Sequence, residues 1–206
     1  AFDICRSILS NNSSNSDALN LAGIAAFQVG LTEEALDLIQ TSVFYSPLNV
    51  GAYTNLGNIF VSLERYKEAR DAYEKAIDLD SNYVEAFFNF GILMEIEDDL
   101  EQSLIAFKKT IELNPNHPGA WHGLGNSYKK QGRIEDSMKA YVEAIKIDPT
   151  LVKARINLSA VFHELGDFDK AIEECLEVLK ITPNLPETHF NLGAALQESG
   201  RYEESI

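Results

Sequence analysis

The sequence has few cysteines and no long apolar segment, so disulfide bonds and membrane spans are not expected to hold the protein together or in place. Its 206 residues include two cysteines, six prolines and one tryptophan. Two cysteines cannot form the dense disulfide framework of a small secreted domain. No run approaches the roughly 20 apolar residues that a membrane span requires, and the N-terminus lacks the basic segment and apolar run of a secretory signal. We therefore expect a protein without membrane partners and with a cytoplasmic location.

Positive charge is also scarce, with 17 Lys and Arg against 32 Asp and Glu and a formal net charge of −15 at pH 7. A charge of this sign repels nucleic-acid phosphates and anionic lipid surfaces. Nucleic acid is therefore not an expected partner, and a protein or peptide partner is favoured.

Residues that carry catalysis or hold metals are few and scattered. The four histidines show no metal-ligand spacing and no paired nucleophile. Phosphate-binding loops and dinucleotide fingerprints are missing from the sequence. Cys5 and Cys175 lie five 34-residue repeats apart, and in a linear array of stacked repeats they cannot come within the roughly 7 Å that a disulfide allows. We expect no catalytic residue, no cofactor and no metal site, and hence not an enzyme.

What the sequence does contain is a frame that repeats every 34 residues without insertion. Counted from Ser16 as position 1, full repeats cover 16–49, 50–83, 84–117, 118–151 and 152–185. Residues 1–15 form the tail of a preceding repeat and 186–206 a partial one, so we expect a single array, 1–206, that is a piece of a longer one. A repeat of this length holds two short helices and becomes stable only by stacking on its neighbours.

Two apolar stripes in each repeat predict two amphipathic helices, A and B. Positions 3, 4, 7, 8 and 11 form the first stripe, and positions 17, 20, 24, 27 and 28 form the second. Glycine at position 15 and proline at position 32 are the expected helix stops. Glu64 and Asp98 replace the turn glycine, which leaves the local turn geometry open. Position 4 becomes Arg155 and His189 near the C-terminus, which predicts exposed or acid-paired side chains there.

The fourth repeat carries the most complete motif: Trp121, Leu124, Gly125, Tyr128, Ser137, Tyr141 and Pro149 follow in order. This pattern resembles the tetratricopeptide repeat family. The resemblance implies an all-α, right-handed superhelical α-solenoid of antiparallel helix pairs. It also implies that the A helices line a concave groove that binds peptide segments of other proteins.

Six asparagines fall on the face of helix A opposite the core, at positions 6 and 9: Asn55, Asn58, Asn89, Asn126, Asn157 and Asn191. A carboxamide offers both a donor and an acceptor, so this stripe can bond the backbone of an extended peptide. The same amides could instead bond a neighbouring helix. The position 6 asparagines are similar to the asparagine ladder in the repeat superhelix of O-linked N-acetylglucosamine transferase, although Leu21 and Gly123 interrupt the series.

An apolar cluster lies on the same predicted face of the third repeat. Phe88, Ile92 and Ile96 occupy positions 5, 9 and 13. Exposed apolar clusters on a repeat surface are typical binding anchors, unless neighbouring helices cover them.

These observations predict a protein-interaction scaffold that binds extended peptide segments in the groove of the A helices. The alternative is the substrate-recruiting region of a larger transferase, of glycosyltransferase or sulfotransferase type, whose catalytic domain lies outside this chain. Self-association through the ends of the array is a further possibility.

Overall fold

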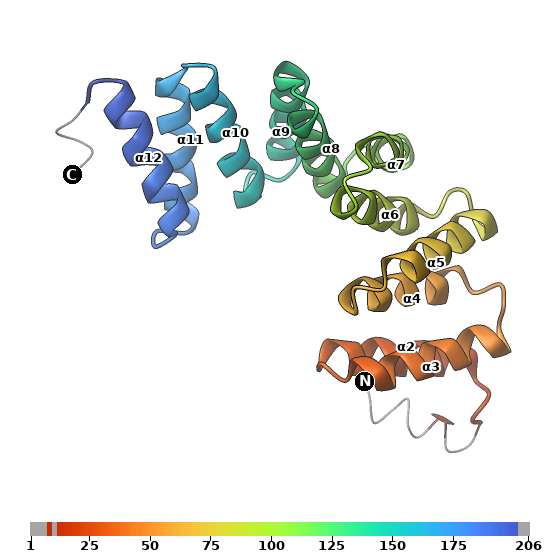
Figure 1. Ribbon diagram of the computed structural model, residues 1–206. Helices are drawn as coiled ribbons and strands as arrows, with labels where there is room; N and C mark the ends of the chain where they lie inside the picture. Colours follow the sequence, from red (N-terminus) through yellow and green to blue (C-terminus); the bar gives the residue numbers. More distant parts are fainter. Residues whose placement is uncertain (1–7, 10–11, 202–206) are drawn as a thin grey trace. The chain divides into compact units, whose positions relative to one another are not determined.

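The computed structural model describes residues 8–9 and 12–201, and every regular element among them is helical. The A helices are α2 (Ser16–Gln28), α4 (Val50–Ser62), α6 (Val84–Ile96), α8 (Pro118–Lys130), α10 (Val152–Glu164) and α12 (Pro186–Glu198). The B helices are α3 (Thr32–Tyr45), α5 (Tyr66–Leu79), α7 (Leu100–Leu113), α9 (Ile134–Ile147) and α11 (Phe168–Ile181). Each A helix therefore starts at position 1 of the repeat and each B helix at position 17. Figure 1 labels these helices.

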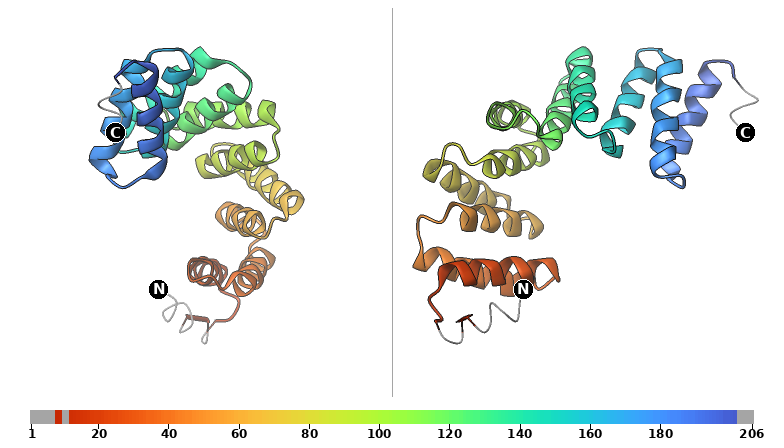
Figure 2. Two further views of the ribbon diagram at one scale, coloured as in Figure 1. Left: turned by 60° about the vertical axis from the view of Figure 1, so that its left-hand side comes forward. Right: turned by 180° about the vertical axis from the view of Figure 1, so that it is seen from behind.

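Helix contacts group the chain into two compact units, residues 1–109 and 110–206. In the first unit α2 packs on α3 and α4 on α5, and each of these hairpins contacts the next A helix. In the second unit α8 packs on α9, α10 on α11, and α11 on α12. Within each unit, antiparallel hairpins lie side by side (Figure 2). This stacking confirms the predicted all-α solenoid class.

Small residues at two positions allow the paired helices to approach closely. Position 3 is alanine in five repeats and threonine in the sixth, and position 20 is alanine or serine in every described repeat. All of these side chains are buried. A larger residue at either position would force the helices apart, because interiors are close-packed.

The paired helices approach closely at position 8 in the first four repeats. A Cβ atom built on Gly57 would lie 2.3 Å from Cε1 of Tyr73, and one built on Gly125 would lie 2.5 Å from Cε1 of Tyr141. These separations are far below van der Waals contact, so the ring at position 24 requires glycine beneath it. The fifth repeat differs, because Ser159 there faces the small side chain of Cys175. Cys175 is buried and unbridged, whereas Cys5 lies outside the described residues.

The turn between helices A and B is left-handed in every described repeat. Gly30, Gly132, Gly166 and Gly200 have φ between 73° and 84°. Glu64 and Asp98 adopt the same conformation, with φ of 58° and 60°. The turn geometry that the sequence left open is thus maintained by residues for which this region is unfavourable.

In the last three A helices the position 4 side chain contacts the carbonyl oxygen of the proline at position 32 of the preceding repeat. Trp121 Nε1 donates to the carbonyl oxygen of Pro115 at 3.0 Å, and Arg155 Nε donates to that of Pro149 at 3.0 Å. His189 Nε2 lies 2.8 Å from the carbonyl oxygen of Pro183. Arg155 also pairs with Glu174 at 2.6 Å, which confirms the predicted pairing with an acid.

None of the helices within residues 8–9 and 12–201 is both long enough and apolar enough to cross a bilayer.

The two kinds of turn residue make a matched pair of tests. A Cβ on Gly132 would meet nothing within 4 Å, so Gly132→Ala introduces only backbone strain. We expect it to destabilise the fold by about 0.5–1 kcal/mol, the strain of a left-handed alanine less the entropy lost by the unfolded chain. Glu64→Gly should stabilise the fold by a similar amount. Urea unfolding followed by circular dichroism measures both, and shifts of the same sign would contradict this account.

Candidate functional site

The predicted site residues lie on one face of the A helices, formed by positions 5, 6, 9 and 13, which we call the A-helix face. All six predicted asparagines lie on it and are half-buried. Their amides are not directed uniformly at solvent. Most of them bond one another across the junctions between repeats.

In the first unit the amide oxygen of Asn58 accepts two hydrogen bonds. Asn58 Oδ1 accepts from Asn89 Nδ2 of the next repeat at 3.0 Å and from the Tyr73 hydroxyl of its own hairpin at 2.7 Å. Asn55 Nδ2 donates to Oδ1 of Asn20, at position 5 of the preceding repeat, at 3.0 Å.

The second unit repeats this arrangement. Asn126 Oδ1 accepts from Asn157 Nδ2 at 2.9 Å and from the Tyr141 hydroxyl at 2.9 Å. Asn157 Nδ2 also lies 3.1 Å from His122 Nε2. We call each set of tyrosine at position 24, asparagine at position 9 and asparagine at position 6 of the next repeat a Tyr–Asn–Asn triad.

Asn191 is the exception among the predicted asparagines. Positions 5 and 9 of the preceding repeat are Ile156 and Ala160, which offer no hydrogen-bonding side chain. No described residue therefore bonds the Asn191 amide. Of the two roles left open by the sequence, pairing with a neighbouring helix is observed for the other five asparagines.

Burial shapes the ionisation of the groups around the triads. Desolvation raises the pKa of the Tyr73 phenol, which keeps its hydroxyl protonated and able to donate. Desolvation, with a smaller contribution from Lys153, lowers the pKa of His122. A neutral His122 keeps a lone pair that can accept from the Asn157 amide.

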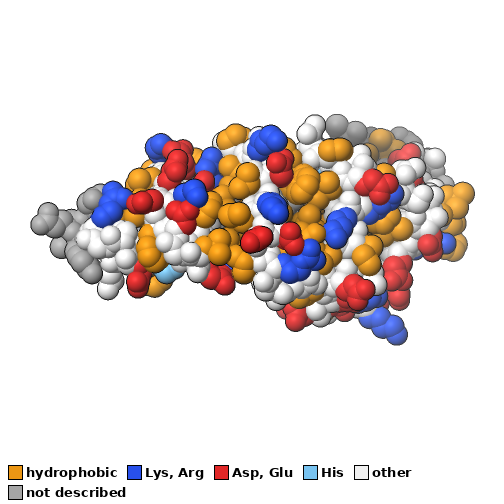
Figure 3. Space-filling model, turned by 90° about the horizontal axis from the view of Figure 1, so that it is seen from above, with side chains coloured by type: hydrophobic (Ala, Val, Ile, Leu, Met, Phe, Trp, Pro, Cys, Tyr) orange, Lys and Arg blue, Asp and Glu red, His pale blue; other side chains and the backbone are white. Residues whose placement is uncertain are grey.

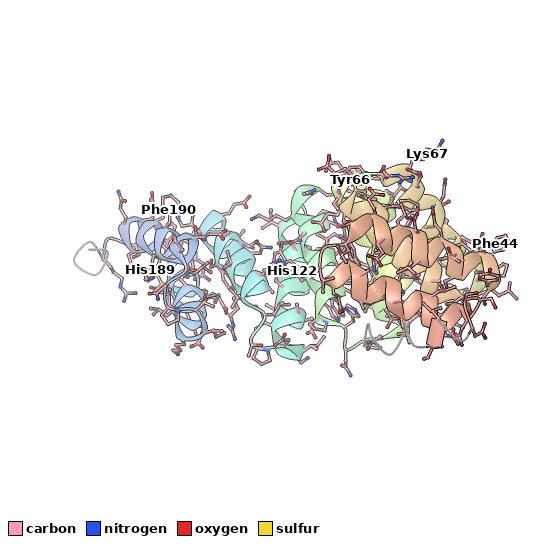
Figure 4. The ribbon with its side chains drawn as sticks, turned by 90° about the horizontal axis from the view of Figure 1, so that it is seen from below. Phe44, Tyr66, Lys67, His122, His189 and Phe190 are labelled. Atoms are coloured by element: carbon pink, nitrogen blue, oxygen red, sulfur yellow. The ribbon has the colours of Figure 1, made fainter. Side chains whose placement is uncertain are left out.

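The apolar cluster of the third repeat is only partly covered. Ile92 is 36% exposed and Ile96 is 48% exposed. Phe88 is half-buried, with its ring centroid 6.0 Å from that of Phe107. The two isoleucines are thus the apolar groups of this cluster that meet water. On α12 Phe190, labelled with His189 in Figure 4, is 76% exposed.

Sequence reasoning missed four residues of this network: Tyr73, Tyr141, Asn20 and His122. The two tyrosines had a detectable signal, because tyrosine occupies position 24 only in the repeats that have asparagine at position 9. Asn20 and His122 share position 5 and each faces a position 6 asparagine of the next repeat.

Other kinds of site find little support in the described part of the chain. No group of three or more His, Cys, Asp and Glu side chains there could hold a metal ion. Acidic and basic side chains are interspersed with apolar ones on the face shown in Figure 3, which presents no patch of a single charge sign.

The buried hydroxyl of a triad can be tested by deletion. Tyr73→Phe removes one of the two bonds to Asn58 and should destabilise the fold by about 0.5–1.5 kcal/mol. Tyr66→Phe is the matched control, because the Tyr66 hydroxyl bonds no described residue and should be nearly silent. Equal effects of the two variants on urea unfolding would show that the triad contributes nothing.

The His122 contact predicts a dependence on pH. Its folded-state pKa is lowered from 6.5, so its contribution to stability is complete above that value and is lost as the pH falls through the lowered pKa. We expect the urea concentration at the unfolding midpoint to be lower at about pH 5.5 than at about pH 7.5. In His122→Gln, whose side-chain oxygen accepts at both values, that fall should be smaller. An identical fall in both proteins would exclude His122 as its cause.

Comparison with known proteins agrees with this architecture. A TPR repeat family model matches residues 57–95, 125–166 and 160–200, and a Tetratricopeptide repeat model matches 106–139. Among curated protein sequences none matches significantly.

Solved structures share the fold at low sequence identity. PilF of Pseudomonas aeruginosa has a TM-score of 0.85 at 14% identity, over 92% of this chain and 86% of that one. YrrB, described as a TPR protein with an unusual peptide-binding site, has a TM-score of 0.70 at 21% identity, over 91% and 97%. The APC/C hetero-tetramer Cut9–Hcn1 has a TM-score of 0.81 at 15% identity, over 95% of this chain and 39% of that one. This is the architecture of a protein-interaction scaffold, and the chain belongs to the tetratricopeptide repeat family.

Proposed function

We propose that the chain binds an extended segment of a partner protein along the A-helix face. The observation that carries the proposal is the pair of exposed isoleucines, Ile92 and Ile96, on the face that also carries the amides. Ile92 and Ile96 lie one turn apart on the same helix, and grouped exposed apolar side chains on a repeat surface are typical of a binding anchor.

The amide pairs are compatible with a ligand role. Asn89 and Asn157 use Nδ2 toward the preceding repeat, and their Oδ1 atoms have no hydrogen-bond partner among the described residues. Each can therefore accept from a backbone N–H of a bound peptide while its pair stays intact. The pairing also fixes the orientation of each amide before binding, which reduces the entropy lost on association.

Magnitudes indicate that amides alone are insufficient. A net hydrogen bond contributes about 0.5–1.5 kcal/mol, whereas a micromolar complex needs about 8 kcal/mol. Burying one isoleucine fully contributes about 1.5–3 kcal/mol. Apolar anchors must therefore supply a large share of the affinity.

The net charge of the chain favours one class of partner segment. With a formal charge of −15, the chain attracts segments rich in Lys and Arg.

Burial raises the pKa of the Cys175 thiol, and a buried free thiol suits a reducing compartment such as the cytoplasm. A peptide-binding site is described for YrrB, which shares the fold. The transferase alternative and self-association through the array ends stay predictions.

Selection from a random-sequence peptide display library tests the proposal. We expect ligands whose affinity falls about tenfold in the Ile92→Ser, Ile96→Ser double variant, because two apolar contacts are lost. The control is Ile105→Ser on helix α7, which removes an isoleucine that is 55% exposed on a B helix. Failure to select any ligand, or equal losses in the double variant and the control, would refute binding at the A-helix face.

A further inference from the structure

The fifth repeat breaks the Tyr–Asn–Asn triad at two of its three positions. Position 24 is Cys175 in place of tyrosine, and position 9 is Ala160 in place of asparagine. The third member, Asn191 at position 6 of the next repeat, is kept. The fifth repeat thus lacks the phenol ring that fills this space in the second and fourth repeats.

A cavity of about 210 Å³ lies at this place. Six of its lining residues carry the argument: Ser159, Ala160, His163, Cys175, Phe190 and Asn191. Four of these occupy positions 8, 9 and 24 of the fifth repeat and position 6 of the next one. In the fourth repeat the equivalent residues Gly125 and Asn126 contact the ring or hydroxyl of Tyr141. The cavity therefore lies where a tyrosine side chain lies elsewhere in the same molecule.

Size and lining suit an aromatic ring. An apolar cavity of about 150 Å³ in another protein is large enough to bind benzene. Alanine and cysteine side chains form part of the lining, and the exposed ring of Phe190 is available for an edge or offset contact with an entering ring.

Polar groups on the lining are left without partners. The Asn191 amide bonds no described residue, because the side chains that pair with the other position 6 asparagines are replaced by Ile156 and Ala160. His163 Nε2 is buried and has no hydrogen-bond partner in the described part of the chain. A buried polar atom without a partner costs free energy. A ligand that brought a hydroxyl group into the cavity would offer a hydrogen-bond partner to the Asn191 amide.

We propose that this cavity is a binding pocket for a tyrosine side chain of the partner peptide. The ring occupies the space that Tyr73 and Tyr141 fill in their own repeats and that the smaller Cys175 leaves open. The hydroxyl bonds the Asn191 amide. The second and fourth repeats supply the template for the ring, since each encloses a tyrosine whose hydroxyl bonds the asparagine at position 9. In the fifth repeat Ala160 replaces that asparagine, and Asn191 is the proposed partner of the hydroxyl. The choice of a peptide as the source of the phenol rests on the proposed function.

The pocket itself can be tested without a partner. p-Cresol is the tyrosine side chain as a free molecule, and toluene is its counterpart without the hydroxyl. Titration of the isotope-labelled protein with each, followed by amide NMR shifts, should show saturable changes at residues of α10 and α12. We expect p-cresol to bind about two- to tenfold more tightly than toluene, the value of one net hydrogen bond. Absence of saturable shifts with both probes overturns the proposal.

Two kinds of variant separate the ring from the hydroxyl. Ser159→Gly, Ala160→Asn, Cys175→Tyr rebuilds the set found in the fourth repeat and should abolish binding of both probes. Should that triple variant not fold, Ala160→Ile, the residue type at position 9 of the first and third repeats, narrows the cavity instead and should weaken both. Asn191→Leu should remove the preference for p-cresol and leave toluene binding within about twofold. A preference retained in Asn191→Leu overturns the assigned hydroxyl contact.

A peptide experiment distinguishes the two proposals. Display-selected ligands should contain a tyrosine whose replacement by alanine weakens binding to the natural chain about tenfold or more and has little effect on binding to the triple variant. Selected peptides without such a tyrosine, together with no p-cresol binding, overturn the pocket and leave the A-helix face as the binding surface. Saturable p-cresol binding without any selected peptide supports the pocket and refutes the proposed function.

Discussion

The architecture depends on one contact, the approach of the position 24 side chain to the backbone of helix A at position 8. Glycine is required there because a Cβ on Gly57 or Gly125 would overlap the ring of Tyr73 or Tyr141. This contact sets the distance between the two helices of a hairpin. With the small residues at positions 3 and 20, it fixes the thickness of the layer that the next hairpin meets, and so the geometry of stacking within each unit.

The same contact carries a polar link to the neighbouring repeat. A ring that lies over glycine can extend its hydroxyl past helix A to the amide at position 9, which also accepts from position 6 of the next repeat. Packing inside one hairpin thereby orients the group that joins it to another. Because a buried amide without partners is costly, the link also selects the register in which the hairpins stack, in addition to adding stability.

The repeat period predicts where the helices lie, but it does not predict how side chains pair across the junctions between repeats. The apolar stripes, with glycine and proline stops in most repeats, predicted the A and B helices, because burial and backbone freedom leave regular marks on a sequence. The six predicted asparagines share one face of the A helices, but their pairing depends on which side chains reach across a junction, and that requires coordinates. Their role in peptide binding stays a prediction. Glu64 and Asp98 adopt the turn that glycine prefers, since tertiary packing outweighs a local penalty of about 1–2 kcal/mol. The handedness of the superhelix stays a prediction, and Cys5 lies outside the described residues.

Recognition in a repeat protein must come from departures from the repeat, because identical units offer a partner identical surfaces. Where the chain keeps the triad, its polar groups are largely satisfied internally and the space beside the glycine is filled. Where Ala160 and Cys175 replace two members of the triad, both the space and the Asn191 amide become available. Cavity formation and the loss of a hydrogen bond normally destabilise a fold by several kcal/mol. A solenoid can tolerate such a loss in one repeat because its stability is a sum over neighbouring repeats, so specificity can be introduced locally without loss of the array.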